Sequence, residues 1–548
     1  MEPKLANIFK DIAALSKKEK TPVYAVGGFV RDMISHSPMP TGRQAYPLSG
    51  RGGDIPASKD VDFVVEGSGL AFAKALDKKL KEVGSLVEFP DFDTARYVFA
   101  PTTPAADAVT PPCLPAGRLG AGGDNIVLEF AGSRAESYHE KSRKPKVVAA
   151  TLKDDLSRRD FTVNAMAIEV TDLVKMSSRP SRRRAEGSLK SDSKRDSSAP
   201  LRFAQNDNVV IDEFNGQKDL KDKILRTPLD PDITFSDDPL RMLRAIRFAA
   251  QLGFSIEPKT LEAIHRNRER MKIVSAERVQ EELMKLMATA SPATGLVLMF
   301  QTHLMDIVLP EVSALDGVEE IWGHQHKNNL IHSFKVVDNI ALRSDKPLLR
   351  LAGLLHDIGK AGTKKFLPKI GWTFHAHEHL GKKLVGDICR RLKFSKDEYK
   401  YLAKLVRYHQ QPIALMDEGI TDSAVRRLIV NLGDELEDLL ILGVSDITTG
   451  NPNKLEKRQN NYKKLRARID EVIEKDKLRA FQSPFRGDDI MAAAGLKPGP
   501  TVGAIKEAIE EAILEGIISN DYEAAKGYFE KIKGEYLAKA SEWEKLPK

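Results

Sequence analysis

The hydrophobic period of the chain changes partway along, and this change limits the folds that it can adopt. Before about residue 235, short β-branched and aromatic runs alternate with segments rich in Gly and Pro. From Phe235 to the end, apolar residues recur with the 3.6-residue period of amphipathic helices. At 548 residues the chain is also too long for one hydrophobic core. We therefore predict an α+β protein: a mixed sheet with helices first, followed by all-α domains.

Composition excludes several classes of protein. No apolar run is long enough to span a bilayer, and the first residues lack the basic-then-apolar pattern of a signal peptide. The only two cysteines, Cys113 and Cys389, lie far apart without the spacing of metal ligands. The formal charge of +7 is mild for this length and does not by itself indicate a polyanionic partner. These features predict a cytoplasmic protein without a membrane partner; they do not indicate an oligomeric state.

One predicted strand, running from Asp60 to Val65, carries two carboxylates. Side chains alternate along a strand, so Asp60 and Asp62 share one face while Val61 and Phe63 point into the core. Two carboxylates on one face repel each other unless a cation lies between them, and oxygen ligands of this kind suit Mg²⁺. An isolated Asp-x-Asp is more often a solvated strand edge, so the interpretation depends on the neighbouring motifs.

Upstream of these carboxylates, a β-branched run at 22–26 ends in Gly27-Gly28, and a helix with Arg31 and Asp32 follows at once. Glycines let backbone N–H groups approach a ligand closely, and the helix N-terminus and Arg31 both favour anions. The pattern predicts a phosphate-binding turn. The alternative is a tight structural turn, which a Gly-Gly-x-x-Arg motif alone does not exclude.

Downstream, Arg158, Arg159, Asp160 and Asn164 stand together in a polar segment that runs into an apolar one. Guanidinium groups bind phosphates with fixed geometry, and the Asp and Asn side chains can bond ribose hydroxyls. We interpret the segment as a site for a nucleoside triphosphate. A capped, salt-bridged start of a helix would also account for these residues.

A helix is predicted to start at Asp238-Pro239, with Asp as the N-cap. Arg241, Arg244 and Arg247 recur in it every third residue, so their side chains form one slowly winding ridge. Asp238 and Arg241 can offer an acceptor and donors to the edge of a base, while Arg244 and Arg247 could hold phosphates. The usual alternative is a solvated charged face. Because apolar residues fill the gaps, we expect the ridge to line a cleft between domains.

In this order, the motifs resemble those of the class II tRNA nucleotidyltransferase and poly(A) polymerase family of bacteria. The glycine turn with Asp60-x-Asp62 is similar to its catalytic motif, 158–165 to its ribose motif, and 237–241 to its nucleotide template. Family members commonly begin the template with Glu-Asp, whereas this chain has Asp237-Asp238. The resemblance implies a polymerase β-like head that uses Mg²⁺ to add the 3′-CCA end to tRNA from CTP and ATP, releasing pyrophosphate.

A second constellation of His and Asp residues lies in the helical half. A lone His on a helix is usually structural, but a His-Asp pair after an apolar helix, with further His and Asp around it, is harder to dismiss. The set resembles the ligands of HD-domain metal-dependent phosphohydrolases, and the resemblance implies Mn²⁺, Ni²⁺, Fe²⁺ or Zn²⁺. The implied ligands are His332, His356, Asp357 and Asp446, and His377 and His409 match a second metal or phosphate site.

The predicted domains follow from these motifs and from changes in composition. The tail carries many Lys and Arg, and either a phosphate-binding arm for tRNA or ordinary solvated helix faces would explain them. We expect a head at 1–230 with disordered insertions at 36–58, 98–123 and 176–208, a neck at 231–320, an HD domain at 321–450 and a helical tail at 451–548.

The resemblance does not determine which nucleotides are added or which half of the chain is catalytic. Relatives add a full CCA end, only CC, only A, or a poly(A) tail. Two further hypotheses are an HD phosphohydrolase whose head only binds RNA, and a non-catalytic RNA-binding protein. Intact Asp60, Asp62 and Arg31 argue against the first of these. Intact His356-Asp357 and the template pair, Asp238 and Arg241, argue against the second.

Overall fold

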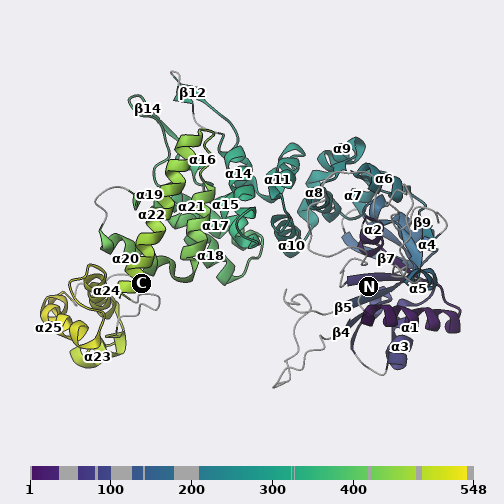
Figure 1. Ribbon diagram of the computed structural model, residues 1–548, viewed down its shortest axis with the longest axis horizontal. Coiled ribbons are helices and arrows are strands. Elements are labelled where there is room, and N and C mark those ends of the chain that lie inside the picture. The colour runs from purple at the N-terminus through teal and green to yellow at the C-terminus, as the bar shows by residue number, and fades with distance from the viewer. Residues whose placement is uncertain are drawn as a thin grey trace, which may run out of the picture. The chain divides into compact units, whose positions relative to one another are not determined.

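A computed structural model describes most of the chain in two units (Figure 1). The units are Met1–Ser275 with Gln301–Ile307, and Ala276–Phe300 with Val308–Lys548. The predicted insertion at 36–58 and all but the first two residues of those at 98–123 and 176–208 lie outside the described residues. The described residues are 3–35, 60–80, 84–99, 126–139, 142–177, 209–321, 324–325, 328–416, 421–476 and 484–539.

The first unit contains a seven-stranded mixed sheet in the order β3-β4-β5-β2-β1-β8-β9. Strands β2 and β5 are parallel, whereas the other neighbours are antiparallel. The predicted mixed sheet in the N-terminal part is confirmed. The strands are β1 (Val23–Val26), β2 (Asp60–Val65), β3 (Ser85–Phe89), β4 (Thr94–Phe99), β5 (Ile126–Gly132), β8 (Ala167–Glu169) and β9 (Val210–Ile211).

Helices cover the two faces of this sheet unequally. The larger core packs α1, α2, α3 and α5 on the face that includes Val61 and Phe63, and the Phe63 ring stacks on Phe130 at 4.9 Å. On the opposite face, Val64 packs with the apolar residues of the short helix α4. Asp60 and Asp62 alternate with the larger core and therefore face the α4 side. The helices are α1 (Pro3–Glu19), α2 (Gly28–Ser35), α3 (Gly69–Leu80), α4 (Leu152–Ser157) and α5 (Val170–Ser177).

The rest of the first unit is mainly helical. The Asp238 carboxylate accepts the N–H of Leu240 at 3.1 Å, but α8 itself begins at Leu240 with Pro239 as its N-cap, one residue later than the sequence predicted. Gly253, at φ +66°, ends this helix in the left-handed conformation that glycine adopts without strain. The elements are β6 (Arg134–His139), β7 (Ser142–Ala149), α6 (Gly216–Asp222), β10 (Ile224–Leu225), α7 (Pro231–Asp237), α8 (Leu240–Leu252), β11 (Ser255–Ile256) and α9 (Pro258–Asn267).

In the described residues of the second unit, helices are interrupted by two small hairpins, β12–β13 and β14–β15, which the prediction of an all-helical half did not include. Short strands joined by a turn do not disturb the helical period around them, so the pattern hid them. The elements are α13 (Pro310–Ser313), β12 (Glu320–Ile321), β13 (His324–Gln325), α14 (Asn329–Ala341), α15 (Pro347–Leu355), α16 (Lys360–Thr363), β14 (Lys365–Leu367), β15 (Gly371–Thr373), α17 (His377–Arg391), α18 (Lys396–Tyr408), α19 (Gln411–Ala414), α20 (Asp422–Leu432) and α21 (Leu436–Ser445).

The C-terminal helices form a small apolar core of their own, in which Phe485 and Phe529 are fully buried. No helix of the described part of the chain is long and apolar enough to cross a membrane. Two helices, α11 (Pro292–Gln301) and α12 (Met305–Val308), cross the division between the units. The remaining helices are α10 (Ala276–Met287), α22 (Pro452–Asp476), α23 (Gly487–Ala494), α24 (Pro500–Leu514) and α25 (Tyr522–Ala538).

Candidate functional site

Three carboxylates share one face of the central sheet. Asp60 and Asp62 are exposed while Val61 between them is buried, as the alternation predicted. The parallel register of β2 and β5 places Glu129 beside Asp62, and Arg96 of β4 holds Glu129 through a 2.8 Å ion pair. Sequence reasoning missed Glu129, since only the pairing of β2 with β5 brings it here.

The electrostatics of this face favour a cation. Although Asp62 keeps contact with solvent, the protein packed around its carboxylate desolvates it and raises its pKa, and the neighbouring carboxylates Glu129 and Asp60 raise it further, against the opposing effect of Arg159 and Arg96. Clustered oxygen ligands of this kind suit a hard divalent ion such as Mg²⁺. The three side chains can therefore hold a metal ion on the open face of the sheet.

The glycine turn lies directly against these carboxylates. Gly27 has φ +73°, and a Cβ atom there would lie 3.2 Å from Nη1 of Arg159 and 3.4 Å from Oδ2 of Asp62. A side chain at Gly27 would be strained and would crowd both groups. The turn, the arginine and the carboxylate therefore meet at one point, which is where the sequence placed a phosphate.

Arg158 and Arg159 share a partner that the sequence analysis did not single out. Both guanidinium groups bond the carboxylate of Asp155, which is fully buried on α4. Thr151 and Asp154 form a capping box at the start of that helix. The capped, salt-bridged helix start considered as the alternative is therefore present. It does not exclude phosphate binding, because Arg159 also lies beside Gly27 and Asp62.

Asp160 joins the phosphate turn to the arginine ridge. Its Oδ1 accepts a bond from Nδ2 of Asn164 at 3.0 Å, and Oδ2 accepts two from Arg244 at 2.5 and 3.0 Å. Asn164 in turn accepts from Nη1 of the buried Arg31 at 2.9 Å. Burial alone would raise the pKa of Asp160, but Arg244 and the bond from Asn164 outweigh it and lower the pKa to about 2. Asp160 is therefore a carboxylate that holds two arginine-bearing elements together.

Phe248 packs against three of the predicted arginines. Its ring centroid lies 4.0 Å from the guanidinium carbon of Arg247, 5.3 Å from that of Arg244 and 5.5 Å from that of Arg31. Arg247 is buried and also bonds Gln251. Cations over an aromatic face are attracted by its quadrupole. Sequence reasoning missed this ring, although its position one residue after Arg247 was visible.

Arg241, at the other end of the ridge, is held by backbone carbonyl groups. Nη2 donates to the carbonyl of Arg158 at 2.6 Å, and Nη1 donates to that of Thr234 at 3.4 Å. The ridge thus contacts the segment that follows α4. These contacts lie within the first unit, so they do not test the predicted cleft between domains, which stays a prediction.

In the second unit, the six predicted HD residues meet because each lies at or near the end of a helix. His356, His409 and Asp446 are the residues that follow α15, α18 and α21, and His377 is the first residue of α17. His332 lies in the first turn of α14. The fold therefore brings together residues 114 positions apart at the extremes, His332 and Asp446.

The six side chains form two groups that share the buried carboxylate of Asp357. In the first group, Nε2 of His332 lies 2.8 Å from Oδ1 of Asp446, and Nε2 of His356 lies 3.2 Å from Oδ2 of Asp357. In the second, the Nε2 atoms of His377 and His409 lie 3.3 and 3.6 Å from Oδ1 of Asp357. The trio His332, His356 and Asp446 and the trio Asp357, His377 and His409 each have the ligand spacing of a metal site.

The outer nitrogen of every histidine is fixed by a protein acceptor. Nδ1 of His356, His377 and His409 bonds a backbone carbonyl at 2.7–2.8 Å, and Nδ1 of His332 bonds the Thr448 hydroxyl at 2.9 Å. Such outer bonds orient imidazole rings for metal binding. Nε2 of His356 is buried 3.2 Å from Asp357 and 3.6 Å from Asp446, but neither contact has the geometry of a hydrogen bond, and a metal ion between these groups would bind all three. The residues therefore fit a metal.

The charges of this cluster lead to the same conclusion. Burial lowers the pKa of His356, but Asp357 and Asp446 outweigh it and raise the pKa to about 10. His356 and the other histidines hold the pKa of Asp357 far below its usual range against the effect of burial. Two carboxylates in a buried site require positive charge nearby, which a divalent ion supplies more fully than a proton.

Lys360 is a further site residue that the sequence reasoning did not name. Its Nζ lies 2.6 Å from Oδ2 of Asp357, at the start of α16. The preceding Gly359 packs on α17, where an added Cβ would lie 2.0 Å from the His377 carbonyl oxygen. This contact keeps the Asp357–Lys360 segment against the histidine. The spacing His-Asp-x-x-Lys was the available signal.

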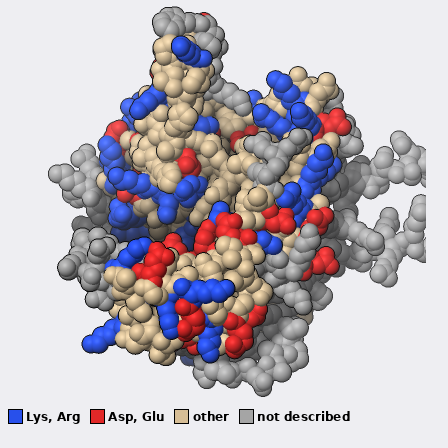
Figure 2. Space-filling model, turned by 90° about the vertical axis from the view of Figure 1, so that its left-hand side faces the viewer, with Lys and Arg blue, Asp and Glu red and all other residues tan. Residues whose placement is uncertain are grey.

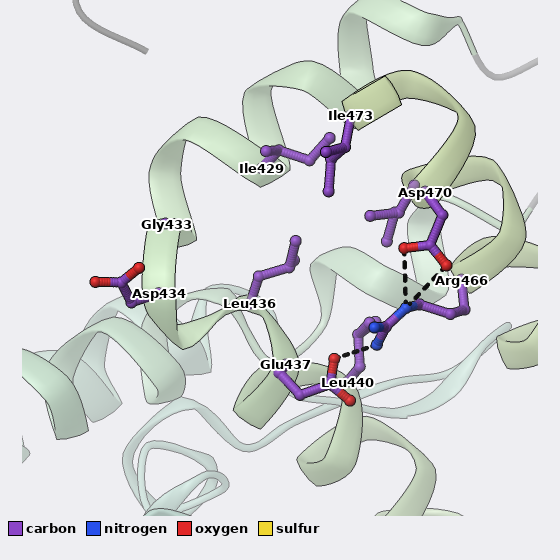
Figure 3. A pocket seen from close by; sticks show the side chains of 10 residues that line it. Ile429, Gly433, Asp434, Leu436, Glu437, Leu440, Arg466, Asp470 and Ile473 are labelled. Carbon is purple, nitrogen blue, oxygen red and sulfur yellow. Dashed lines mark hydrogen bonds and ion pairs between the residues drawn. The ribbon is translucent and has the colours of Figure 1, made fainter. Parts of the chain in front are cut away.

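Away from these clusters, two arginines of the tail helix α22 are paired with acidic residues. A pocket of about 270 Å³ between α20, α21 and α22 contains Arg466, which is already paired with Glu437 and Asp470 (Figure 3). Basic and acidic side chains intermix on the face of the molecule in Figure 2. On α22, Arg468 also pairs with an acidic residue, Asp422. The tail's phosphate-binding arm stays a prediction.

Three family models match separate parts of the chain. The poly A polymerase head domain matches residues 118–177, the probable RNA and SrmB-binding site of polymerase A matches 253–315, and the HD domain matches 329–470.

Curated relatives are about a third identical to the chain over the residues that align. An A-adding tRNA nucleotidyltransferase of Deinococcus radiodurans is 30% identical over 382 residues, which cover 68% of this chain and 78% of that protein. A CC-adding tRNA nucleotidyltransferase of Thermus thermophilus is 32% identical over 56% of this chain and 69% of its own. A solved CCA-adding enzyme with CTP has the same fold, with TM-score 0.54 and 20% identity over 98% of this chain and 96% of that one.

Proposed function

Because the chain belongs to the tRNA nucleotidyltransferase family, we propose that it adds the 3′-terminal CCA sequence to tRNA from CTP and ATP. Pyrophosphate is released at each addition. The observation that carries the proposal is the meeting of Asp62, Gly27 and Arg159 on the sheet of a chain with these relatives. The proposal includes a cytoplasmic location, because tRNA is processed there.

Asp60 and Asp62, with Glu129 beside them, are the proposed Mg²⁺ ligands. An Mg²⁺ ion held by these carboxylates would lower the pKa of the RNA 3′-hydroxyl and stabilise charge on the leaving pyrophosphate. The backbone of Gly27-Gly28 and the guanidinium of Arg159 bind the triphosphate. The oxygen of the RNA 3′-hydroxyl bonds to the α-phosphorus as the bond to pyrophosphate breaks, so no protein nucleophile is needed.

Base selection is assigned to Asp238 and Arg241. A carboxylate and a guanidinium can complement the edges of A and C, whereas G and U present the opposite order of donors and acceptors. Arg241 bonds the Arg158 carbonyl at 2.6 Å, so a base that bonds the same Nη2 would compete with that carbonyl. Arg31 and Arg244, linked through Asn164 and Asp160, hold the phosphate and ribose side. Arg247 supports them through Phe248, and Asp32, which bonds Nε of Arg31, holds that arginine in place.

The second activity that the residues support is metal-dependent hydrolysis of a phosphoester at the HD cluster. Imidazole and carboxylate ligands suit Mn²⁺, Ni²⁺, Fe²⁺ or Zn²⁺, which activate water when bound. His332, His356, Asp357 and Asp446 would hold one ion and His377 and His409 a second, with Asp357 between them. Opening a 2′,3′-cyclic phosphate by water at the bond to O3′ gives a 2′-phosphate and the free 3′-hydroxyl that nucleotide addition requires.

Nucleotide addition is tested with the full chain and a tRNA transcript that lacks its last three nucleotides. With Mg²⁺, CTP and ATP together, sequencing of the extended ends should show CCA. Ends that stop at CC, gain only A, or carry longer A runs would contradict CCA addition. Asp62→Asn should abolish extension, whereas Asp91→Asn, a matched change at an exposed residue of the same unit, should not.

The hydrolase is tested separately with RNA that ends in a 2′,3′-cyclic phosphate and each of the four metals in turn. His356→Ala should abolish hydrolysis and leave nucleotide addition to an intact 3′-hydroxyl unchanged. Equal hydrolysis by the wild type and by His356→Ala would rule out the HD cluster as its site.

A further inference from the structure

Asp438 is a buried carboxylate of the second unit that is not one of the proposed metal ligands. Its two oxygens each accept a bond from Nζ of Lys346 at 2.9 Å, and Oδ2 also accepts one from the Tyr401 hydroxyl at 2.7 Å. Burial and the bond to Asp438 raise the pKa of Tyr401, so its phenol stays protonated and donates. We refer to Lys346, Tyr401 and Asp438 as the clamp.

The clamp joins three helices whose C-caps are predicted metal ligands. On each helix, eight to ten positions separate the clamp residue from the ligand. At a rise of about 1.5 Å per residue, the clamp therefore lies about 12–15 Å along the helices from the HD cluster. The pairs are Lys346 and His356 at the two caps of α15, Tyr401 and His409 on α18, and Asp438 and Asp446 on α21.

The three helices also pack on one another, α15 on both α18 and α21, and α18 on α21 (Figure 1). Their apolar contacts are non-directional, whereas the bonds of the clamp fix both distance and angle. Because an α-helix is a stiff element, bonds that fix it near one end also limit where its other end can lie. The clamp can therefore act on ligands that it does not touch.

Two physical arguments indicate that the clamp serves the metal site. A buried ion pair generally adds little to stability, because desolvation offsets the attraction of the two charges. Stability alone therefore does not account for Lys346 and Asp438. The C-terminal ends of α15, α18 and α21 also meet at the HD cluster, and the negative ends of helix dipoles favour a cation. Keeping these ends together is what a metal site requires.

We propose that Asp438 is a positioning residue that sets the distances between the metal ligands of the HD cluster through Lys346 and Tyr401. The proposal rests on the metal-dependent hydrolase function proposed above and adds to it a residue that touches neither metal nor substrate. Without the clamp, the helices shift relative to one another and the ion has to draw the ligands together. Part of the binding free energy is then spent on ordering the ligands, so the metal binds more weakly.

The affinity of the full chain for Ni²⁺, measured by competition with a chromogenic chelator, tests the proposal without any substrate. Binding that remains in His356→Ala is subtracted as background from other sites. Asp438→Asn replaces one accepting oxygen with a donor and should weaken Ni²⁺ binding about ten-fold. Asp219→Asn is the matched control and should leave it unchanged, because Asp219 is also buried and accepts from a hydroxyl, Thr162 at 2.8 Å, and a cation, Arg226 at 3.1 Å, but lies in the first unit.

Lys346 provides a second pair of variants in case Asp438→Asn does not fold, since its side chain is 63% exposed. Lys346→Met removes the cation and should weaken Ni²⁺ binding, whereas Lys346→Arg keeps donors for both oxygens and should bind Ni²⁺ as the wild type does. Urea unfolding of the metal-free proteins measures the stability of each variant separately.

Two results would overturn the proposal. Wild-type Ni²⁺ affinity in folded Asp438→Asn or Lys346→Met, whatever the loss of stability, would show that the clamp only stabilises the fold. Equal weakening by Lys346→Met and Lys346→Arg would show that Lys346 does not act through its bonds to Asp438. A wild-type chain that binds no Ni²⁺ beyond the His356→Ala background would instead contradict the metal site itself, and with it the hydrolase function.

Discussion

Replacing Phe248 should weaken nucleotide binding in the head without removing any polar contact. The ring is 7% exposed and lies 4.0, 5.3 and 5.5 Å from the guanidinium carbons of Arg247, Arg244 and Arg31. A cation over an aromatic ring contributes about 0.5–1 kcal/mol when exposed and about 2 kcal/mol when desolvated. Phe248→Leu removes the ring and keeps a side chain of similar hydrophobicity. The arginines then lose the surface that aligns them with the phosphates.

The expected loss is about 1–2 kcal/mol of transition-state stabilisation, or a 5- to 30-fold lower kcat/KM for both CTP and ATP. Steady-state incorporation at saturating tRNA measures it. Phe72→Leu is the matched control, because Phe72 is 4% exposed in the same unit and packs on Phe130. Both variants shrink a buried ring, so both should lose comparable stability in urea unfolding. An equal fall in kcat/KM for the two variants would refute a role of Phe248 in aligning the arginines.

Three further predictions test the other assigned contacts. Asp160→Asn should lower the local stability measured by hydrogen exchange by about 2 kcal/mol, since the fold lowers the pKa of Asp160 from 3.8 to about 2 and each pKa unit corresponds to roughly 1.4 kcal/mol. A carboxylate whose pKa is lowered by folding stabilises the folded protein fully at pH values above its unfolded pKa of 3.8. The difference in stability between the wild type and Asp160→Asn should therefore hold from pH 7 to 5 and shrink as the pH falls towards 2. A difference that grows on acidification would contradict the assignment. Arg241→Ala should preserve folding and relax the choice of nucleotide, and unchanged selection of A and C over G and U would refute its role. His377→Ala should lower the bound metal, measured by elemental analysis, from two ions to one per chain, and an unchanged ratio would exclude a second metal at that histidine.

Local periodicity was sufficient to predict the elements that carry the chemistry. The alternation of Asp60 and Asp62 with buried Val61 and Phe63 needs only the two-residue period of a strand, and the structure confirms it. The bond that Asp238 accepts from the N–H of Leu240 is equally local, although α8 begins one residue later than predicted. Such features depend on neighbours within a few residues, which the sequence displays directly.

Contacts between distant segments could not be predicted in this way. Glu129 lies 67 positions after Asp62 and reaches it only through the parallel register of β2 and β5. The sequence of two arginines beside an Asp is also the same whether the guanidinium groups are available to bind a phosphate or already bond a buried carboxylate. Arg158 bonds Asp155, while Arg159 bonds it and also faces Asp62, and only the fold distinguishes the two.

The outer bonds of the four HD histidines have a consequence for metal supply. Each imidazole is oriented by a carbonyl or hydroxyl of the protein itself, at 2.7–2.9 Å. The ligand cage is therefore assembled by folding and does not depend on the ion to shape it, in contrast to a zinc finger. Chelation should strip the site without unfolding the chain, and reloading should need no chaperone. The same preformed set of ligands could then bind a different divalent metal when one metal is scarce in the cell.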